Sequence, residues 1–302
     1  MSPLVFFCFL SGVINFITTL SLGIFLLLKS SQIKTNRYFA YFCFSVAFWS
    51  FFYFLWLWTP GSVMAEYYLR TCMIGVFFIP ATFLHFVVNF LNRKMSLWFI
   101  AFNYALGIIS IFFVYTFFYA YGMDKFIGFW WLQPGPFFHV IILHFALVMS
   151  YAFWLLYYYA FHITQEESFK RQIKLVFMAV FIGYISGSMN YLMWYRVPVP
   201  PVANALVAAY VLIITYAILK YQLLDIKIVI KNSLVYSILA SIITIVYFGM
   251  IYFSEHFLKM AIGYHSTVAS LATAMVVAVF FIPLKDFIQS LIEKYIFKAT
   301  DI

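Results

Sequence analysis

The chain has 302 residues, of which 66% are hydrophobic, 24% aromatic and only 9% charged, and its mean hydropathy is +1.00. Soluble globular domains average about 45–50% apolar and about 25% charged residues, so this composition excludes a soluble enzyme and a soluble DNA-binding module. The excess of apolar residues also excludes a disordered chain. A membrane-spanning helix needs about 20 mostly apolar residues, so the sequence predicts a polytopic membrane protein with almost no length left for a soluble domain.

Nine apolar runs follow one another along the chain, and each is long enough for a transmembrane helix. The runs are continuous, whereas the strands of a membrane β-barrel alternate between apolar and polar residues. We therefore expect an all-α bundle of about nine spans. The expected helices are Pro3–Leu28, Tyr38–Trp58, Leu69–Leu91, Ser96–Tyr119, Phe137–Phe161, Ile173–Tyr195, Pro201–Leu219, Leu234–Phe253 and Thr267–Pro283.

The basic residues divide unequally between the two sides of such a bundle. The net charge is +9, with 18 Lys and Arg in total. If the N-terminus is outside, the cytoplasmic segments hold 14 of these 18 residues, and the outer segments hold four, namely Arg70, Lys125, Arg196 and Lys259. The positive-inside rule therefore predicts an outer N-terminus and a cytoplasmic C-terminus, with anionic lipids of the inner leaflet as natural partners.

Small residues within the apolar runs predict close packing. Cys8, Cys43 and Cys72 show no metal-binding spacing, so we interpret them as small buried hydrophobic residues. Gly183 and Gly187 form a G-x-x-x-G motif, which allows two helix backbones to approach closely. This motif predicts packing within the bundle, and a dimer interface is the alternative.

The outer segment Tyr121–Phe138 places two adjacent tryptophans, Trp130 and Trp131, before a Gln-Pro-Gly-Pro turn. One interpretation is an aromatic anchor at the membrane interface. The other is a lid over an outward pocket, walled by the third, fifth, sixth and seventh helices, that suits an apolar or amphipathic ligand. The residues proposed to bind such a ligand are His85, Asn89, Trp131, His139, His144 and Asn190.

The histidines within the spans allow more than one role. His85 and Asn89 lie four residues apart on the third helix, and His139 and His144 lie in the outer part of the fifth. Haem ligation requires two histidines that face each other at one depth, and we expect His85 and His144 at different depths. Hydrogen bonding between helices is the favoured role, with a small-molecule pocket or haem as alternatives.

The sequence offers little catalytic chemistry. All nine acidic residues fall in loops, helix ends or the tail, whereas ion-coupled transport usually requires carboxylates inside the membrane. We find no Ser/His/Asp set, P-loop, HExxH motif or carboxylate pair. We therefore expect no catalytic residue, no metal site and no cofactor, and we expect that this chain is not an enzyme.

The last stretch of the chain mixes apolar and polar residues instead of continuing as an apolar run. Between residues 284 and 297, apolar side chains recur with the spacing of an amphipathic helix. Such a helix either lies on the inner membrane surface or begins a dimeric signalling helix. The residues proposed to carry a signal out are Leu284, Phe287, Ile288, Leu291 and Tyr295.

Several segments, taken in order, resemble the N-terminal seven-helix sensor region of bacterial histidine kinases. The second helix begins at an asparagine and ends its apolar run with Trp49, and the third carries an Ile-Pro-x-x-Phe pattern. The seventh begins with paired prolines and leaves the membrane through KYQLLDI. The resembling segments are Asn36–Tyr53, Ile74–Leu91, the sixth helix from Lys170 through GYISGSMNYL, Ala217–Leu239 and Phe281–Phe297.

This resemblance implies a membrane-embedded, dimeric sensory module that passes a stimulus to a kinase, located in the inner membrane of a bacterium. It implies three parts: residues 1–232 as the seven-helix sensor, residues 233–283 as two further spans, and residues 284–302 as the cytoplasmic helix. The resemblance includes no kinase region, so either the module acts on a separate kinase or response protein, or the sequence is a sensor fragment of a longer kinase. Nucleic acid is not an expected partner. A transporter or lipid-handling protein, and a haem or quinone redox protein, are the alternatives.

Overall fold

The computed structural model describes residues 2–30, 32–221 and 283. The chain separates into two units, Met1–Lys227 and Ile228–Ile302, and the elements below all belong to the first. In chain order they are α1 (Pro3–Ser30), α2 (Lys34–Trp58), α3 (Ser62–Phe90), α4 (Leu97–Phe113), β1 (Ala120–Phe126), β2 (Phe129–Pro134), α5 (Pro136–Tyr158), the π-helical turn η1 (Tyr159–Ile163), α6 (Glu167–Ser188), α7 (Asn190–Trp194), the 3-10 turn η2 (Val202–Leu206) and α8 (Val207–Tyr221).

Each of the first seven helices expected from the sequence overlaps a helix in the structure, although the fourth ends at Phe113 instead of Tyr119. The third begins at Ser62 instead of Leu69, so Arg70, expected at the outer end of this helix, lies eight residues inside α3. The sixth is interrupted at Met189, where the Asn190 side chain donates a hydrogen bond to the Gly187 carbonyl oxygen and competes with the helical main-chain bond. The last two expected spans and the five proposed output residues lie outside the described residues.

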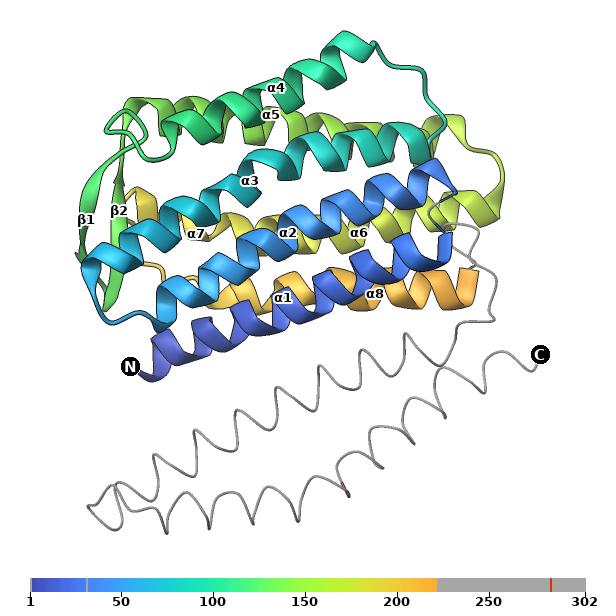
Figure 1. Ribbon diagram of the computed structural model, residues 1–302. Coiled ribbons are helices and arrows are strands. Elements are labelled where there is room, and N and C mark those ends of the chain that lie inside the picture. The colour runs from blue at the N-terminus through green and yellow to red at the C-terminus, as the bar shows by residue number, and fades with distance from the viewer. Residues whose placement is uncertain (1, 31, 222–282, 284–302) are drawn as a thin grey trace. The chain divides into compact units, whose positions relative to one another are not determined.

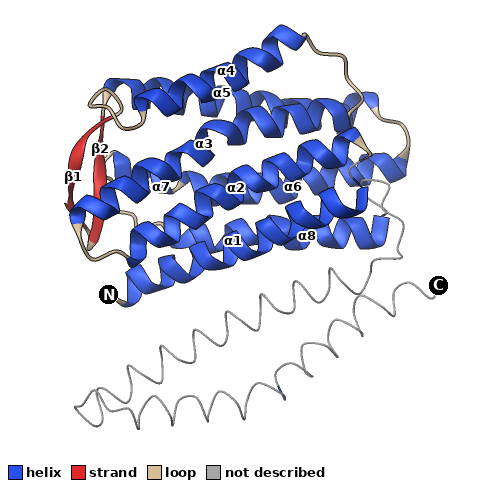
Figure 2. Cartoon of the chain, in the orientation of Figure 1, coloured by secondary structure: helices blue, strands red, loops and turns tan. Residues whose placement is uncertain are grey.

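The expected all-α fold needs one correction, because the outer segment after α4 is a β-hairpin instead of a loop. Strands β1 and β2 pair antiparallel, with Phe126 opposite Phe129. The two residues between them, Ile127 and Gly128, have φ angles of +48° and +80°. A two-residue turn with positive φ at both positions matches the twist of a hairpin. Figure 2 shows this hairpin in red, lying across one end of the bundle.

Six of the helices form a closed ring. Following the contacts between neighbours, the order around the ring is α1, α2, α3, α5, α6, α8 and back to α1. Helix α4 packs on the outside, against α3 (Figure 1). The fold therefore has an interior that several helices can line together.

Five of the described helical segments are long and apolar enough to cross a membrane. They are Pro3–Leu28, Lys34–Trp58, Ser62–Phe90, Pro136–Ile163 and Glu167–Trp194, and the shorter apolar helices Leu97–Phe113 and Val202–Ala217 accompany them. All three cysteines are free and fully buried, which confirms their interpretation as small buried side chains.

The contact between α2 and α3 depends on a glycine. A Cβ atom at Gly75 would lie 2.6 Å from the backbone nitrogen of Trp49 and 2.8 Å from the carbonyl oxygen of Ser45. Real Cβ atoms do not approach backbone atoms this closely. The two helix backbones can therefore lie at this distance only because Gly75 has no side chain, as in the close helix contacts typical of membrane bundles.

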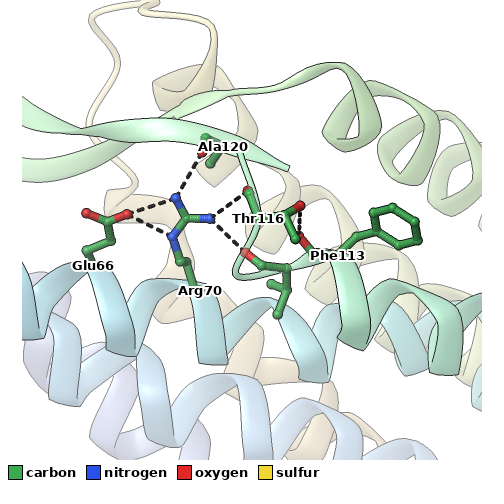
Figure 3. Close-up of polar contacts among 6 residues, drawn as sticks. Glu66, Arg70, Phe113, Thr116 and Ala120 are labelled. Carbon is green, nitrogen blue, oxygen red and sulfur yellow. Dashed lines mark hydrogen bonds and ion pairs between the residues drawn. The ribbon is translucent and has the colours of Figure 1, made fainter. Parts of the chain in front are cut away.

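The side chain of Arg70 joins α3 to the segment that leads into the hairpin (Figure 3). Its Nε and Nη2 atoms bind Glu66 Oε1 at 2.9 Å and 2.8 Å. Nη1 donates to the carbonyl oxygens of Val114 at 2.7 Å and Thr116 at 3.3 Å, and Nη2 donates to that of Ala120 at 2.9 Å. Arg70 is only 7% exposed, so its bonds to Val114 and Ala120 are shielded from water, whereas the Glu66 carboxylate is partly exposed.

Further bonds hold the hairpin to the ring. The Trp56 indole of α2 donates to the Trp130 carbonyl oxygen at 2.8 Å, and the Trp130 indole donates to the Pro60 carbonyl oxygen at 3.3 Å. Asp124 of β1 forms an ion pair with Arg196, just after α7. The hairpin is thus attached to three different parts of the bundle.

We expect Gly75→Ala to destabilise the protein. Its Cβ must push α2 and α3 apart, and overpacking of this kind costs about 1–3 kcal/mol, although alanine is otherwise the better helix former. Thermal unfolding in detergent measures the loss. Gly187→Ala is the matched control, because its Cβ would meet no atom closer than 3.8 Å. Equal melting temperatures for the two variants would show that α2 and α3 are not in close contact.

We expect Arg70→Lys to loosen the hairpin while the helices stay folded. Lysine keeps the charge but cannot reach Glu66 and three carbonyl oxygens at once, because it lacks the planar guanidinium fork. Hydrogen–deuterium exchange should then rise by about tenfold or more in residues 114–135, consistent with the loss of buried hydrogen bonds worth about 1–3 kcal/mol each.

Lys170→Met is the control for this experiment, because it removes an exposed ion pair with Glu167, a kind of contact that contributes about 0–1 kcal/mol. If Arg70→Lys left the hairpin as protected as Lys170→Met does, Arg70 would not hold the hairpin.

Candidate functional site

The ring of helices encloses a cavity beneath the hairpin. The cavity volume is about 70 Å³, measured as the space open to the centres of water-sized molecules. A single water needs about 10–15 Å³ by this measure, so the cavity has room for a group several times the size of a water molecule. The lining residues are Phe42, Val46, Trp49, Tyr53, Leu69, Cys72, Met73, Val76, Ile79, Trp131, Phe145, Met149, Val180, Gly183, Tyr184, Gly187, Ser188, Asn190, Tyr191, Trp194, Val207 and Tyr210.

Six of the described helices contribute to the cavity, each through one face. On α2 the lining residues are Phe42, Val46, Trp49 and Tyr53, and this spacing of three and four residues places them in a single row. Helices α3, α5, α6, α7 and α8 add further rows, whereas α1 and α4 supply no lining residue. The sequence predicts a pocket walled by the third, fifth, sixth and seventh helices. The structure adds α2 to that wall.

Trp131 of β2 closes the hairpin end of the cavity. Its side chain is 1% exposed, and its ring meets the Trp56 ring edge to face, with centroids 4.8 Å apart. Trp56 in turn lies 5.4 Å from Tyr53. Strand β2 also contacts α7, which carries Asn190 and Trp194. The hairpin therefore places Trp131 beside Trp56 of α2, and it places β2 beside the helix that carries Asn190 and Trp194.

The two glycines of the G-x-x-x-G motif line the cavity where α6 faces α8. A Cβ at Gly183 would lie 3.4 Å from Tyr210, and one at Gly187 would lie 3.8 Å from Val207 and 3.9 Å from Trp49. These are ordinary van der Waals distances. The motif thus serves packing within the bundle, and a larger side chain at Gly187 would extend between two lining residues.

Three lining residues carry a buried polar atom that has no hydrogen-bond partner among the described residues. The atoms are the Tyr53 hydroxyl, the Trp131 Nε1–H and the Asn190 Oδ1. More than 90% of buried polar groups in proteins are paired, and each unpaired group costs about 1–3 kcal/mol. The cavity therefore has apolar walls, and three of its lining residues carry a polar atom without a partner.

A buried polar network fixes the orientation of Asn190. Its Nδ2 donates to the Gly187 carbonyl oxygen at 2.9 Å and to Asn204 Oδ1 at 3.4 Å. Asn204 Nδ2 donates to Ser11 Oγ at 3.2 Å, and Asn15 Nδ2 donates to the Asn204 carbonyl oxygen at 3.0 Å. Because the amide nitrogen is occupied, Asn190 offers only its oxygen to the cavity.

Of the six residues proposed from the sequence to bind a ligand, the structure brings Trp131 and Asn190 together at the cavity. His85 lies elsewhere, stacked on the Tyr38 ring at 3.6 Å, with Nδ1 3.2 Å from the Tyr104 hydroxyl. Asn89 donates to the His85 carbonyl oxygen at 2.8 Å. His85 therefore connects α2, α3 and α4 outside the cavity lining.

The two histidines of α5 also lie outside the cavity lining. His144 Nε2 is 2.8 Å from Asn103 Oδ1 of α4, beside a gap with no room for a water molecule. His139 Nδ1 is 2.9 Å from the Tyr195 hydroxyl. Burial raises the pKa of Tyr195 above its ordinary value, so this hydroxyl stays protonated at neutral pH and can donate to His139.

Sequence reasoning missed the contribution of α2, above all Trp49 and Tyr53. Their spacing with Phe42 and Val46 was visible in the sequence, but α2 is apolar on all sides, so no polar face marked the opposite, lipid-facing side. Among the described residues, no group of three or more His, Cys, Asp or Glu side chains could hold a metal ion.

Comparison with known proteins identifies the family. The profile described as "N-terminal 7TM region of histidine kinase" matches residues 11–227, which covers all the described helices except the first turns of α1. The match confirms the resemblance seen in the sequence and suggests a membrane sensory input module, and no kinase-domain profile matches. No curated protein and no solved structure matches the chain. The chain is a multi-pass membrane protein that belongs to the family of N-terminal seven-transmembrane regions of histidine kinases.

Proposed function

We propose that this chain is the sensory input module of a histidine-kinase-type signalling system, and that an apolar or amphipathic ligand acts on it by binding in the cavity of the helix ring. The observation that carries this proposal is the cavity itself, which has apolar walls, unpaired polar atoms and a fixed lid. Ligand pockets typically have apolar linings and a few convergent polar groups.

The ligand acts by favouring one packing of the ring over another. A ligand shifts such an equilibrium only as far as its affinities for the two packings differ. Lining residues come from α2, α3, α5, α6, α7 and α8, so a filled cavity alters the spacing among most of the helices of the ring. Helix α8 supplies Val207 and Tyr210 and leads toward the rest of the chain, which makes it the route by which the change leaves the ring.

The signal is proposed to leave through the amphipathic segment 284–302, which is outside the described residues. In this account Leu284, Phe287, Ile288, Leu291 and Tyr295 form its apolar face. The module acts as a homodimer and passes the change to a cytoplasmic kinase or response protein, which holds the catalytic activity that we do not assign to this chain.

The proposed topology has nine spans in a bacterial inner membrane, with an outer N-terminus and a cytoplasmic C-terminus. The charge distribution supports it, since 14 of the 18 basic residues then face the cytoplasm. The hairpin and the start of α1 lie at one end of the bundle, and the α1–α2, α3–α4 and α5–α6 connections lie at the other (Figure 1). The hairpin then closes the cavity on the outer side.

A kinase fusion tests the sensory function. With a histidine kinase catalytic core joined after Ile302, we expect Gly187→Leu to change autophosphorylation by about fivefold or more, because coupling free energies of 1–3 kcal/mol correspond to changes of about 5–150-fold. Gly187→Ala should give a smaller change in the same direction, because it fills less of the cavity.

Ala101→Leu is the control for this fusion, because it adds the same side chain to an exposed position on α4. The comparison needs folded protein, so equal amounts of each variant must reach the membrane. Autophosphorylation that is the same in both Gly187 variants, the control and the unchanged chain would contradict a sensory role for the cavity.

Cysteine labelling tests the topology. The native cysteines are fully buried, whereas Lys125 of β1 and Lys94 after α3 are exposed. We expect a membrane-impermeant maleimide to label Lys125→Cys in intact cells and to label Lys94→Cys only after the cells are permeabilised. The reverse pattern would place the hairpin in the cytoplasm.

A further inference from the structure

The unpaired polar atoms of the cavity gather at its hairpin end. Tyr53 and Trp131 both contact the Trp56 ring, with centroids 5.4 Å and 4.8 Å away. Asn190 begins α7, the helix that β2 contacts. The remaining wall is mostly hydrocarbon and aromatic, with Val76, Met149 and Val180 among its residues. It also includes the tyrosines Tyr184, Tyr191 and Tyr210.

The three polar atoms have different hydrogen-bonding capacities. The Trp131 indole only donates, the Asn190 Oδ1 only accepts, and the Tyr53 hydroxyl does both. A ligand group that pairs with Trp131 and Asn190 must therefore accept one hydrogen bond and donate another. A hydroxyl group does this with a single oxygen atom, and a secondary amide does it with two neighbouring atoms.

The lining also determines the charge of the ligand. None of the lining residues is Asp, Glu, Lys, Arg or His, and Arg70 is already bound to Glu66 and three carbonyl oxygens. A charged group that enters such a site loses its hydration and gains no counter-charge. Carboxylates, phosphates and ammonium groups are therefore disfavoured, and a neutral ligand is favoured.

We propose that the cavity binds a neutral amphipathic molecule, such as a medium-chain alcohol, with its hydroxyl group between Tyr53, Trp131 and Asn190 and its hydrocarbon chain along the ring. This inference rests on the proposed function and names the ligand class of the same site. The polar end of the ligand is thereby placed at the hairpin, beside Trp131.

Photolabelling of the full chain in lipid nanodiscs tests this ligand class. The probe is octanol carrying a diazirine, and mass spectrometry locates its adducts. We expect saturable labelling of cavity residues such as Met73 and Met149, displaced by unlabelled octanol. Gly187→Leu should lower this labelling by about tenfold, and Ala101→Leu should leave it unchanged. Labelling that does not saturate, or that is equal in both variants, would overturn the proposal.

A second set of probes tests the hydroxyl group. Tyr53→Phe should weaken octanol labelling by about two- to tenfold, the effect of one lost hydrogen bond, and should leave labelling by an octane diazirine unchanged. Its stability should equal or exceed that of the unchanged chain, because the hydroxyl that it removes is unpaired. A diazirine of octanoate should not label the cavity. Equal labelling by all three probes would overturn the neutral hydroxyl ligand.

The labelling and fusion experiments distinguish a wrong ligand class from a wrong sensory function. If octanol labels the cavity but leaves the kinase fusion silent, the ligand class holds and the sensory function is wrong. If the fusion responds to Gly187→Leu while octanol fails to label the cavity, the sensory function holds and the ligand class is wrong.

Discussion

The guanidinium of Arg70 is the contact on which the closed cavity depends. It brings a positive charge into a nearly dry site, which is tolerated only because Glu66 neutralises it and three backbone carbonyl oxygens accept its remaining hydrogen bonds. Two of those carbonyls belong to the segment between α4 and β1, and the third belongs to Ala120, the first residue of β1. One side chain on α3 thus determines where the hairpin begins, and the hairpin carries Trp131 to the end of the cavity.

The ring of helices and the hairpin make different contributions to the site. Close contacts such as that between Gly75 and Trp49 allow α2 and α3 to approach, so their inner faces form a continuous apolar wall. Gly183 and Gly187 leave space where α6 meets α8. The hairpin adds polar character, because it brings the unpaired Trp131 indole N–H into a lining that also holds Tyr53 and Asn190, whose hydroxyl and amide oxygen are unpaired. The cavity therefore has both open space and unpaired polar atoms only at the end where the ring of helices meets the hairpin.

The positions of the described helices could be predicted from continuous apolar runs, because a bilayer requires about 20 such residues for each span. The inward face of α2 could not, because lipid and protein interior are both apolar and no polar stripe separates them. The hairpin was missed because its turn is Ile127-Gly128, whereas Asn-Gly or Asp-Gly marks such turns in a sequence. Of the residues proposed for their polar or amphipathic character, Trp131 and Asn190 do line the cavity, whereas His85 and His144 have the same character and instead bond to residues of α4.

The most direct test of a ligand-binding cavity closed by the hairpin is a cryo-electron microscopy map of the full chain in nanodiscs with saturating octanol. We expect non-protein density inside the ring, within hydrogen-bond distance of Tyr53, Trp131 and Asn190, with the Arg70 contacts intact. A ring collapsed onto itself, with Trp131 turned out of the cavity and no density between α2 and α6, would contradict it.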